Sequence, residues 1–178
     1  MNDTRRLQAL CGNFDRREVS YASFMEECTR LIATVIGCAR VGIWLFEDAA
    51  EGRVLRCLSF YDGNRDRMIN LPDETSLQVG AYFEALEQVG HVLANDACTH
   101  PATAGFFNDK VSAHGVRSLM AASFSVNGRL FGAFTCTQTQ LTEWSPAQLA
   151  TLKRMGARVS LALVNASRTN QSTLPMPL

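Results

Sequence analysis

Apolar residues recur at helical spacing in two long segments, one near each end of the chain. In the first, residues 20–36, a single apolar stripe runs along one face. Ser23 followed by Glu26 has the spacing of a capping box, and Gly37 is placed to end the helix. The pattern predicts an amphipathic helix that buries one stripe against the rest of the protein.

The second helical segment, residues 145–165, carries two apolar stripes. Ser145 is the predicted N-cap, Pro146 the first helical residue, and Gln148 completes a capping box. A helix with two stripes has two surfaces to cover, and another subunit is one candidate for the second. Residues 1–19 are polar with few apolar positions. They are expected to form either a short helix that docks on a partner or a frayed arm.

Short apolar runs bounded by turn residues predict strands between these helices. Residues 40–47 and 54–62 form a predicted antiparallel hairpin, and residues 91–96 form a further strand. Residues 115–139 contain two apolar runs joined by Asn127-Gly128. This pair favours a tight hairpin turn, because both central residues of such a turn need positive φ.

The order of the elements predicts an α+β fold, with a further helix over residues 75–89. Hairpin-paired strands with separate helices are typical of a mainly antiparallel sheet that carries helices on one face. We expect connections within residues 62–114 to cover the other face, including an irregular helix near 102–110. Long connections in compact domains are more often functional than structural filler.

Composition and charge narrow the class of protein. The chain has 178 residues, of which 47% are hydrophobic and 19% charged, as in a single globular domain. Lys plus Arg and Asp plus Glu number 17 each, so charge gives no reason to expect a nucleic acid or an anionic membrane as partner. No apolar run is long enough for a membrane span, and the N-terminus lacks a signal peptide, so a cytoplasmic location is expected.

Six scattered cysteines and three histidines show no metal-ligand spacing, and no CxxC motif occurs. In a reducing compartment such cysteines behave as small buried hydrophobic residues. The chain also contains no glycine-rich phosphate loop and no GxSxG or HExxH motif. We therefore expect neither a metal site nor catalysis, and no required cofactor.

Four stretches, taken in order, resemble a GAF domain over about Ser20 to Asn165. They are "ARVGIWLFE", "VLANDACTHPATAGF", "GVRSLMAASFSVNGRLFGAFTCTQ" and "WSPAQLATLKRMGARVSLAL". The resemblance implies a six-stranded antiparallel sheet in a sensory or regulatory module. It further implies that the N- and C-terminal helices, residues 20–36 and 145–165, form a homodimer bundle on one face, with a small-molecule pocket on the other. It implies a signalling output domain, in cis or in trans. The output proteins of such modules include diguanylate cyclases and histidine kinases. The sensor domain then spans residues 20–166, followed by a flexible tail, 167–178.

Strand alternation suggests which residues line that pocket. In "VGIWLF", Val41, Ile43 and Leu45 suit the helices, whereas Trp44 and Phe46 point the other way; Trp44 resembles the aromatic that looks into the chromophore pocket of phytochrome-type members. A pocket wall is apolar with a few polar groups. The candidate ligand-binding residues are Trp44, Phe46, Asp96, Cys98, Phe106, Phe107, Ser118, Met120, Ala122, Phe134 and Cys136.

Each candidate also has a structural interpretation. Trp44 either faces a ligand or fills the core, and Asp96 either binds a ligand or caps the turn that follows it. Some GAF domains attach a bilin through Cys followed directly by His, but here the order is Cys98-Thr99-His100, which argues against covalent bilin. Haem through His91, His100 or His114 is a further alternative.

Free methionine sulfoxide reductase is the enzymatic use of this fold, and it needs an attacking and a resolving thiol close together. Here only Cys98, Cys136 and Cys57 are candidates, and their surroundings do not resemble that enzyme. The sequence thus predicts a non-catalytic GAF-type sensor that binds a small molecule and signals as a homodimer. The alternative is a ligand-free dimerisation module in which Trp44, Phe106 and Phe107 fill the pocket.

Overall fold

An antiparallel sheet forms the centre of the protein in the computed structural model, which describes residues 2–50, 52–72, 74–105, 115–126 and 128–169. Its strands are β1 (Arg40–Ala49), β2 (Gly52–Asp62), β3 (Arg67–Met68), β5 (His91–Ala94), β6 (Ser118–Val126) and β7 (Arg129–Gln138), in the spatial order β3-β2-β1-β7-β6-β5. A short strand outside this order, β4 (Glu74–Thr75), pairs with β2. The predicted α+β class, both hairpins and the six-stranded antiparallel sheet are confirmed, with β4 as an additional short strand.

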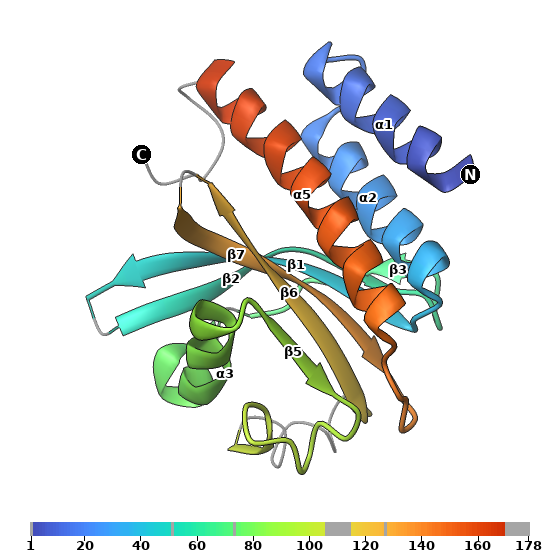
Figure 1. The fold of residues 1–178 in the computed structure, drawn as a ribbon. Coiled ribbons are helices and arrows are strands. Elements are labelled where there is room, and N and C mark those ends of the chain that lie inside the picture. Colours follow the sequence, from blue (N-terminus) through green and yellow to red (C-terminus); the bar gives the residue numbers. More distant parts are fainter. Residues whose placement is uncertain (1, 51, 73, 106–114, 127, 170–178) are drawn as a thin grey trace.

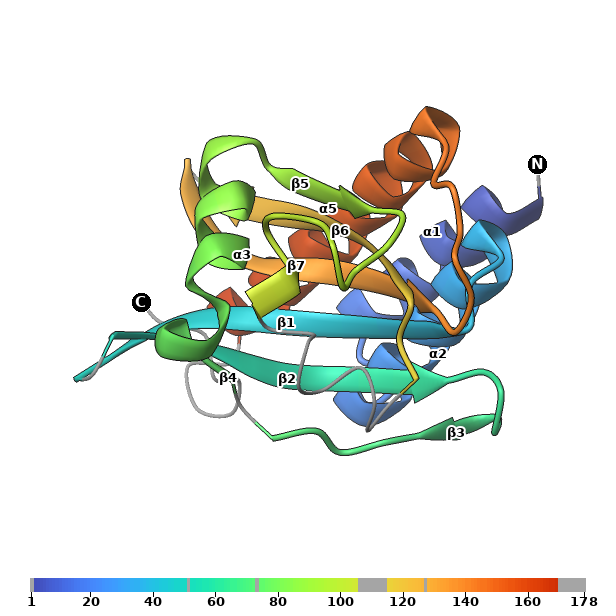
Figure 2. The same ribbon diagram turned by 90° about the horizontal axis from the view of Figure 1, so that it is seen from below.

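Helices cover the two faces of the sheet unequally. Helices α1 (Asn2–Asp15), α2 (Tyr21–Ile36) and α5 (Pro146–Thr169) lie together on one face, and α3 (Ser76–Gln88) lies on the other (Figures 1 and 2). Two separate apolar cores correspond to these faces. We call them the helix-bundle face and the α3 face.

The ends of the long helices follow local sequence signals. Gly37 ends α2 in the left-handed region with φ of 74°, and Ser145 and Gln148 exchange the two predicted capping-box hydrogen bonds at 3.0 and 3.1 Å. The predicted capping box at Ser23 is wrong. Ser20 is the N-cap and accepts from the Ser23 backbone N–H at 3.1 Å, because extended backbone at residue 20 lets the helix start one turn earlier.

Helix α1 packs on α2 and α5 of its own chain. Leu7, Cys11 and Phe14 are buried in the helix-bundle core, and the Phe14 ring stacks on Phe24 of α2 with centroids 4.1 Å apart. Dispersion and apolar burial at this contact hold the N-terminal helix to the domain.

The helix-bundle core depends on close approach of α5 to the sheet. Phe134 of β7 is almost fully buried, and its ring lies against Gly156 of α5. A Cβ at position 156 would stand 2.8 Å from a carbon of that ring, so only glycine leaves room for it. Gly156 thus contributes to the apolar face of α5 because its lack of a side chain lets the Phe134 ring contact the helix.

Candidate functional site

The α3 face is built around two aromatic residues of β1. Trp44 and Phe46 point toward α3, whereas Val41, Ile43 and Leu45 point into the helix-bundle core, as alternation along β1 predicts. The indole Nε1 of Trp44 donates to Thr135 Oγ1 at 3.0 Å, and the indole lies over Gly42, where a Cβ would overlap it. Gly42 and Thr135 thus fix the direction of the half-buried tryptophan.

Helix α3 closes the other side of this site. Phe83 meets Phe46 edge to face, with ring centroids 5.0 Å apart, and Leu86 and Val79 pack in the same cluster. The backbone of α3 is kinked at Val79, where φ is −127°. The described side chains therefore form an apolar wall between α3 and the sheet.

Tyr82 introduces a polar atom into this wall. Only 6% of the residue is exposed, and its hydroxyl has no hydrogen-bond partner among the described residues. Burial raises the pKa of Tyr82 well above its usual value, so the phenol is neutral and able to donate or accept. A buried unpaired hydroxyl is costly, and a bound polar group would remove that cost.

Tyr82 and Thr135 are not among the site residues predicted from the sequence. The pattern of residues 75–89 is too weakly amphipathic to identify an inward polar position, since the apolar Val89 within it is 61% exposed. Thr135 is found only from the pairing of β7 with β1, in which it stands opposite Gly42.

Four predicted pocket residues lie on the opposite side of the sheet from Trp44 and Phe46. Phe134 and Cys136 pair directly with Ile43 and Val41 of β1, and cross-strand partners share a face. Met120 and Ala122 pair in turn with Cys136 and Phe134. All of them therefore belong to the helix-bundle core, which corrects their grouping with Trp44 into one pocket.

Ser118 is buried, and its hydroxyl is fully engaged by backbone groups. Its Oγ lies 2.6 Å from the Asn95 carbonyl oxygen and 2.8 Å from that of Gln140, and it accepts from the Thr142 N–H at 2.7 Å. This serine joins the chain segments that follow β5 and β7. It has no free hydrogen-bonding capacity for a ligand.

The Asp96 carboxylate caps its own turn, since its Oδ1 accepts from the Cys98 N–H at 3.1 Å, and its other oxygen lies 4.0 Å from Arg117. Cys98 is a free, half-buried thiol beside this turn. Several predicted features lie outside the described residues. They are Phe106, Phe107, most of the predicted helix near 102–110 and most of the predicted tail.

The cysteines do not gather at the α3 face. Cys57 pairs with Trp44 across β1 and β2 and so shares its face, whereas Cys136 is buried on the opposite face. Burial and the neighbouring Cys38 thiol raise the pKa of Cys136, which disfavours the nucleophilic thiolate. Among the described residues no group of three His, Cys, Asp or Glu side chains is placed to hold a metal ion.

These features define a class: an antiparallel α+β domain with terminal helices on one sheet face and a short helix and long connections on the other. Residues 21–163 match the family model described as the GAF domain. The match spans most of the chain, so the chain belongs to the GAF domain family, which confirms the resemblance seen in the sequence.

Solved structures share the fold at low sequence identity. The phycocyanobilin-bound GAF domain of a cyanobacterial phytochrome has a TM-score of 0.77 and 14% identity, covering 97% of this chain and 99% of that chain. The GAF domain of an Acinetobacter phosphoenolpyruvate-protein phosphotransferase has a TM-score of 0.68 and 12% identity, covering 97% and 99%.

An enzyme also shares this fold. A free methionine-R-sulfoxide reductase from Neisseria meningitidis, in complex with its substrate, has a TM-score of 0.66 and 12% identity, covering 92% of each chain. None of the curated proteins compared matches this chain. Over the part of the chain that the structure describes, no helix is both long and apolar enough to cross a membrane.

Proposed function

We propose that this chain is a non-catalytic sensory or regulatory GAF domain that binds a small molecule at the α3 face. The observation that carries the proposal is the buried, unpaired Tyr82 hydroxyl within a wall of aromatic side chains. A pocket of this type is mainly apolar, with few polar groups that orient the ligand. A flat or apolar molecule with one hydrogen-bonding group would satisfy Tyr82 and pack beside Trp44 and Phe46.

Strand β1 supplies the path for a signal. Its alternate residues Trp44 and Phe46 meet the α3 face, and the intervening Ile43 and Leu45 are buried against the helices. A ligand that binds better to one arrangement of β1 shifts the population toward it, and with it the packing of α2 and α5. We propose that these helices form a homodimer bundle in the cytoplasm that is read by an output domain in cis or in trans.

Native and denaturing mass spectra of the same purified sample, with an absorbance scan, test this proposal. We expect a dimer that carries extra mass in the native spectrum and loses it on denaturation. Tyr82→Phe should retain the fold and lose the extra mass, while Val89→Ala, a change at an exposed position, should keep it. A native species with no added mass, unchanged by Tyr82→Phe, would contradict ligand binding at this face.

Covalent mass with visible absorbance would instead point to a chromophore. The phytochrome GAF domain of similar fold is phycocyanobilin-bound. In this chain Cys98 is separated from His100 by Thr99, unlike the adjacent Cys-His of bilin-attaching members that the resemblance implies.

A ligand-free dimerisation module is the second candidate. The close Phe46–Phe83 contact favours it, because apolar side chains already fill much of the α3 face. Trp44→Ala separates the two functions. If the parent protein shows no ligand response and Trp44→Ala only lowers its stability, the tryptophan fills the core. If Trp44→Ala removes a ligand response and the fold stays intact, the domain is a sensor.

The reductase activity of a protein with similar fold gives the remaining alternative. Turnover of free methionine sulfoxide that Cys98→Ser abolishes would overturn the non-catalytic proposal. The placement of Cys136 away from Cys57 argues against such turnover.

A further inference from the structure

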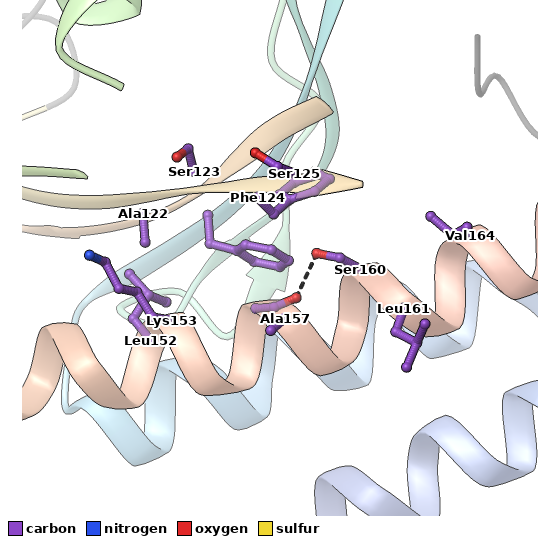
Figure 3. A pocket seen from close by; sticks show the side chains of 12 residues that line it. Ala122, Ser123, Phe124, Ser125, Leu152, Lys153, Ala157, Ser160, Leu161 and Val164 are labelled. Atoms are coloured by element: carbon purple, nitrogen blue, oxygen red, sulfur yellow. Dashed lines mark hydrogen bonds between the residues drawn. The ribbon is translucent and has the colours of Figure 1, made fainter. Parts of the chain in front are cut away.

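A second hollow lies on the helix-bundle face, on the opposite side of the sheet from Trp44 and Tyr82. It is a groove of about 450 Å³ where α5 crosses the turn-proximal half of β6 and the middle of β7 (Figure 3). This volume lies within the range of small-molecule sites. The apolar side chains that line it are Phe124, Phe134, Leu152, Ala157, Leu161 and Val164.

Small residues create the groove. Ala157 of α5 and Ala122 of β6 leave space that larger side chains would fill, and Gly156 lets the Phe134 ring approach α5 closely. The lining runs along α5 from Leu152 to Val164, which are twelve helical rises of 1.5 Å apart, or about 18 Å of helix axis. The space is therefore elongated along the helix and suits a chain-like molecule.

Two of the three serine hydroxyls in the lining are engaged by backbone carbonyls, and the third belongs to the exposed Ser125. Ser160 donates to the Gly156 carbonyl oxygen at 2.6 Å, and Ser123 donates to the Gly90 carbonyl oxygen at 3.1 Å. These hydroxyls gain little from a ligand, because their protons are used by backbone acceptors. The body of the groove thus favours an apolar chain.

Lys153 supplies the charge at one end. It is the ionisable residue of the described lining, and no carboxylate among the described residues pairs with it. Its Nζ lies 3.4 Å from His91 Nδ1, but that nitrogen is also 3.2 Å from the Val89 carbonyl oxygen. An ammonium group carries three N–H donors, so Lys153 can meet an anion even while one of them faces His91.

We propose that this groove binds an amphipathic monocarboxylate, such as a medium-chain fatty acid. The carboxylate would meet Lys153, and the hydrocarbon chain would run along α5 past Phe124 toward Val164 (Figure 3). Apolar burial supplies most of the affinity, and the single cation sets the polarity of the ligand. The site contacts α5 directly and is distinct from the one proposed at the α3 face.

Calorimetric titration with octanoate tests the site, with octylammonium as the probe of equal chain length and opposite charge. We expect saturable octanoate binding and much weaker octylammonium binding. Lys153→Gln should weaken octanoate binding by about fivefold, the upper end for an exposed ion pair. Ala157→Phe should abolish measurable binding, because its ring would occupy the groove.

Matched variants keep the test specific. Arg154→Gln removes the same charge from the next residue of α5, outside the lining, and should leave the octanoate affinity unchanged. Trp44→Ala should also leave it unchanged, because the indole is on the opposite face. Melting followed by circular dichroism checks that each variant is folded.

Several outcomes would overturn the proposal. They are absence of saturable binding, equal binding of the two probes, and octanoate affinity that depends on Trp44 but not on Lys153. The proposal would also fail if the parent protein binds no octanoate and is a dimer in solution that Ala157→Phe converts to monomers. That result would show that a second copy covers the groove.

Discussion

The two faces of this sheet are closed in different ways. The helix-bundle face is covered by α2 and α5, with α1 packed on both, over a strand surface that includes Phe124 and Phe134. It buries Phe24, Ile32 and Ile43 almost completely. The α3 face is covered by one short, kinked helix and a cluster of aromatic residues, and it leaves the Tyr82 hydroxyl unpaired. The helix-bundle core also leaves a buried polar atom, Trp144 Nε1, without a partner among the described residues, so the two faces differ in the depth of their helical cover rather than in polar satisfaction.

The largest expected effect breaks the helix-bundle face. Phe24→Ala removes a fully buried ring that stacks on Phe14 of α1, so it should lower the free energy of unfolding by about 3 to 5 kcal/mol. Urea denaturation followed by circular dichroism measures this loss. Val89→Ala, at a position 61% exposed, is the control and should change stability by less than about 0.5 kcal/mol. A loss below about 1 kcal/mol for Phe24→Ala would show that α1 and α2 pack differently.

A smaller change tests how the α3 face is ordered. At Gly42 an added Cβ would overlap the Trp44 indole and approach Thr135 Oγ1, so Gly42→Ala should cost about 1 to 3 kcal/mol and turn the indole. Tryptophan fluorescence and urea denaturation report both effects. Gly80→Ala in α3 is the matched control, because its Cβ would meet no neighbouring atom within 4 Å and alanine favours the helix by about 1 kcal/mol. Equal stability of the two variants would contradict the placement of Trp44.

The start of α2 gives a prediction of intermediate size. Ser20→Ala should cost about 1 kcal/mol, because it removes the side-chain acceptor for the Ser23 N–H. Ser23→Ala leaves that acceptor in place and should cost a few tenths of a kcal/mol at most. Thermal melting of both variants compares them, and a larger loss for Ser23→Ala would restore the capping box expected from the sequence.

The same contrast explains what sequence could predict. Within β1, alternation alone separates Trp44 and Phe46 from Val41, Ile43 and Leu45, since period two is a property of a single strand. Which residues of two neighbouring strands share a face depends on the register of their pairing, and the sequence alone does not determine that register. Phe134 and Cys136 were therefore grouped with Trp44, although pairing to Ile43 and Val41 turns them to the helices. Long helices were predictable from periodic stripes and caps, whereas the weak pattern of α3 concealed Tyr82.

The smallest expected effect on stability is also the sharpest test of the α3 face. Tyr82→Phe removes a buried hydroxyl with no partner among the described residues, so the free energy of unfolding should stay the same or rise slightly. Ligand affinity at that face should fall, because the orienting hydrogen bond is lost while the apolar wall remains. Urea denaturation of protein stripped of ligand, paired with native mass spectrometry of protein as purified, separates the two effects. If Tyr82→Phe instead destabilises the stripped protein by more than about 1 kcal/mol, the hydroxyl already has a structural partner. Both faces would then serve packing alone, and the α3 face would not be a ligand site.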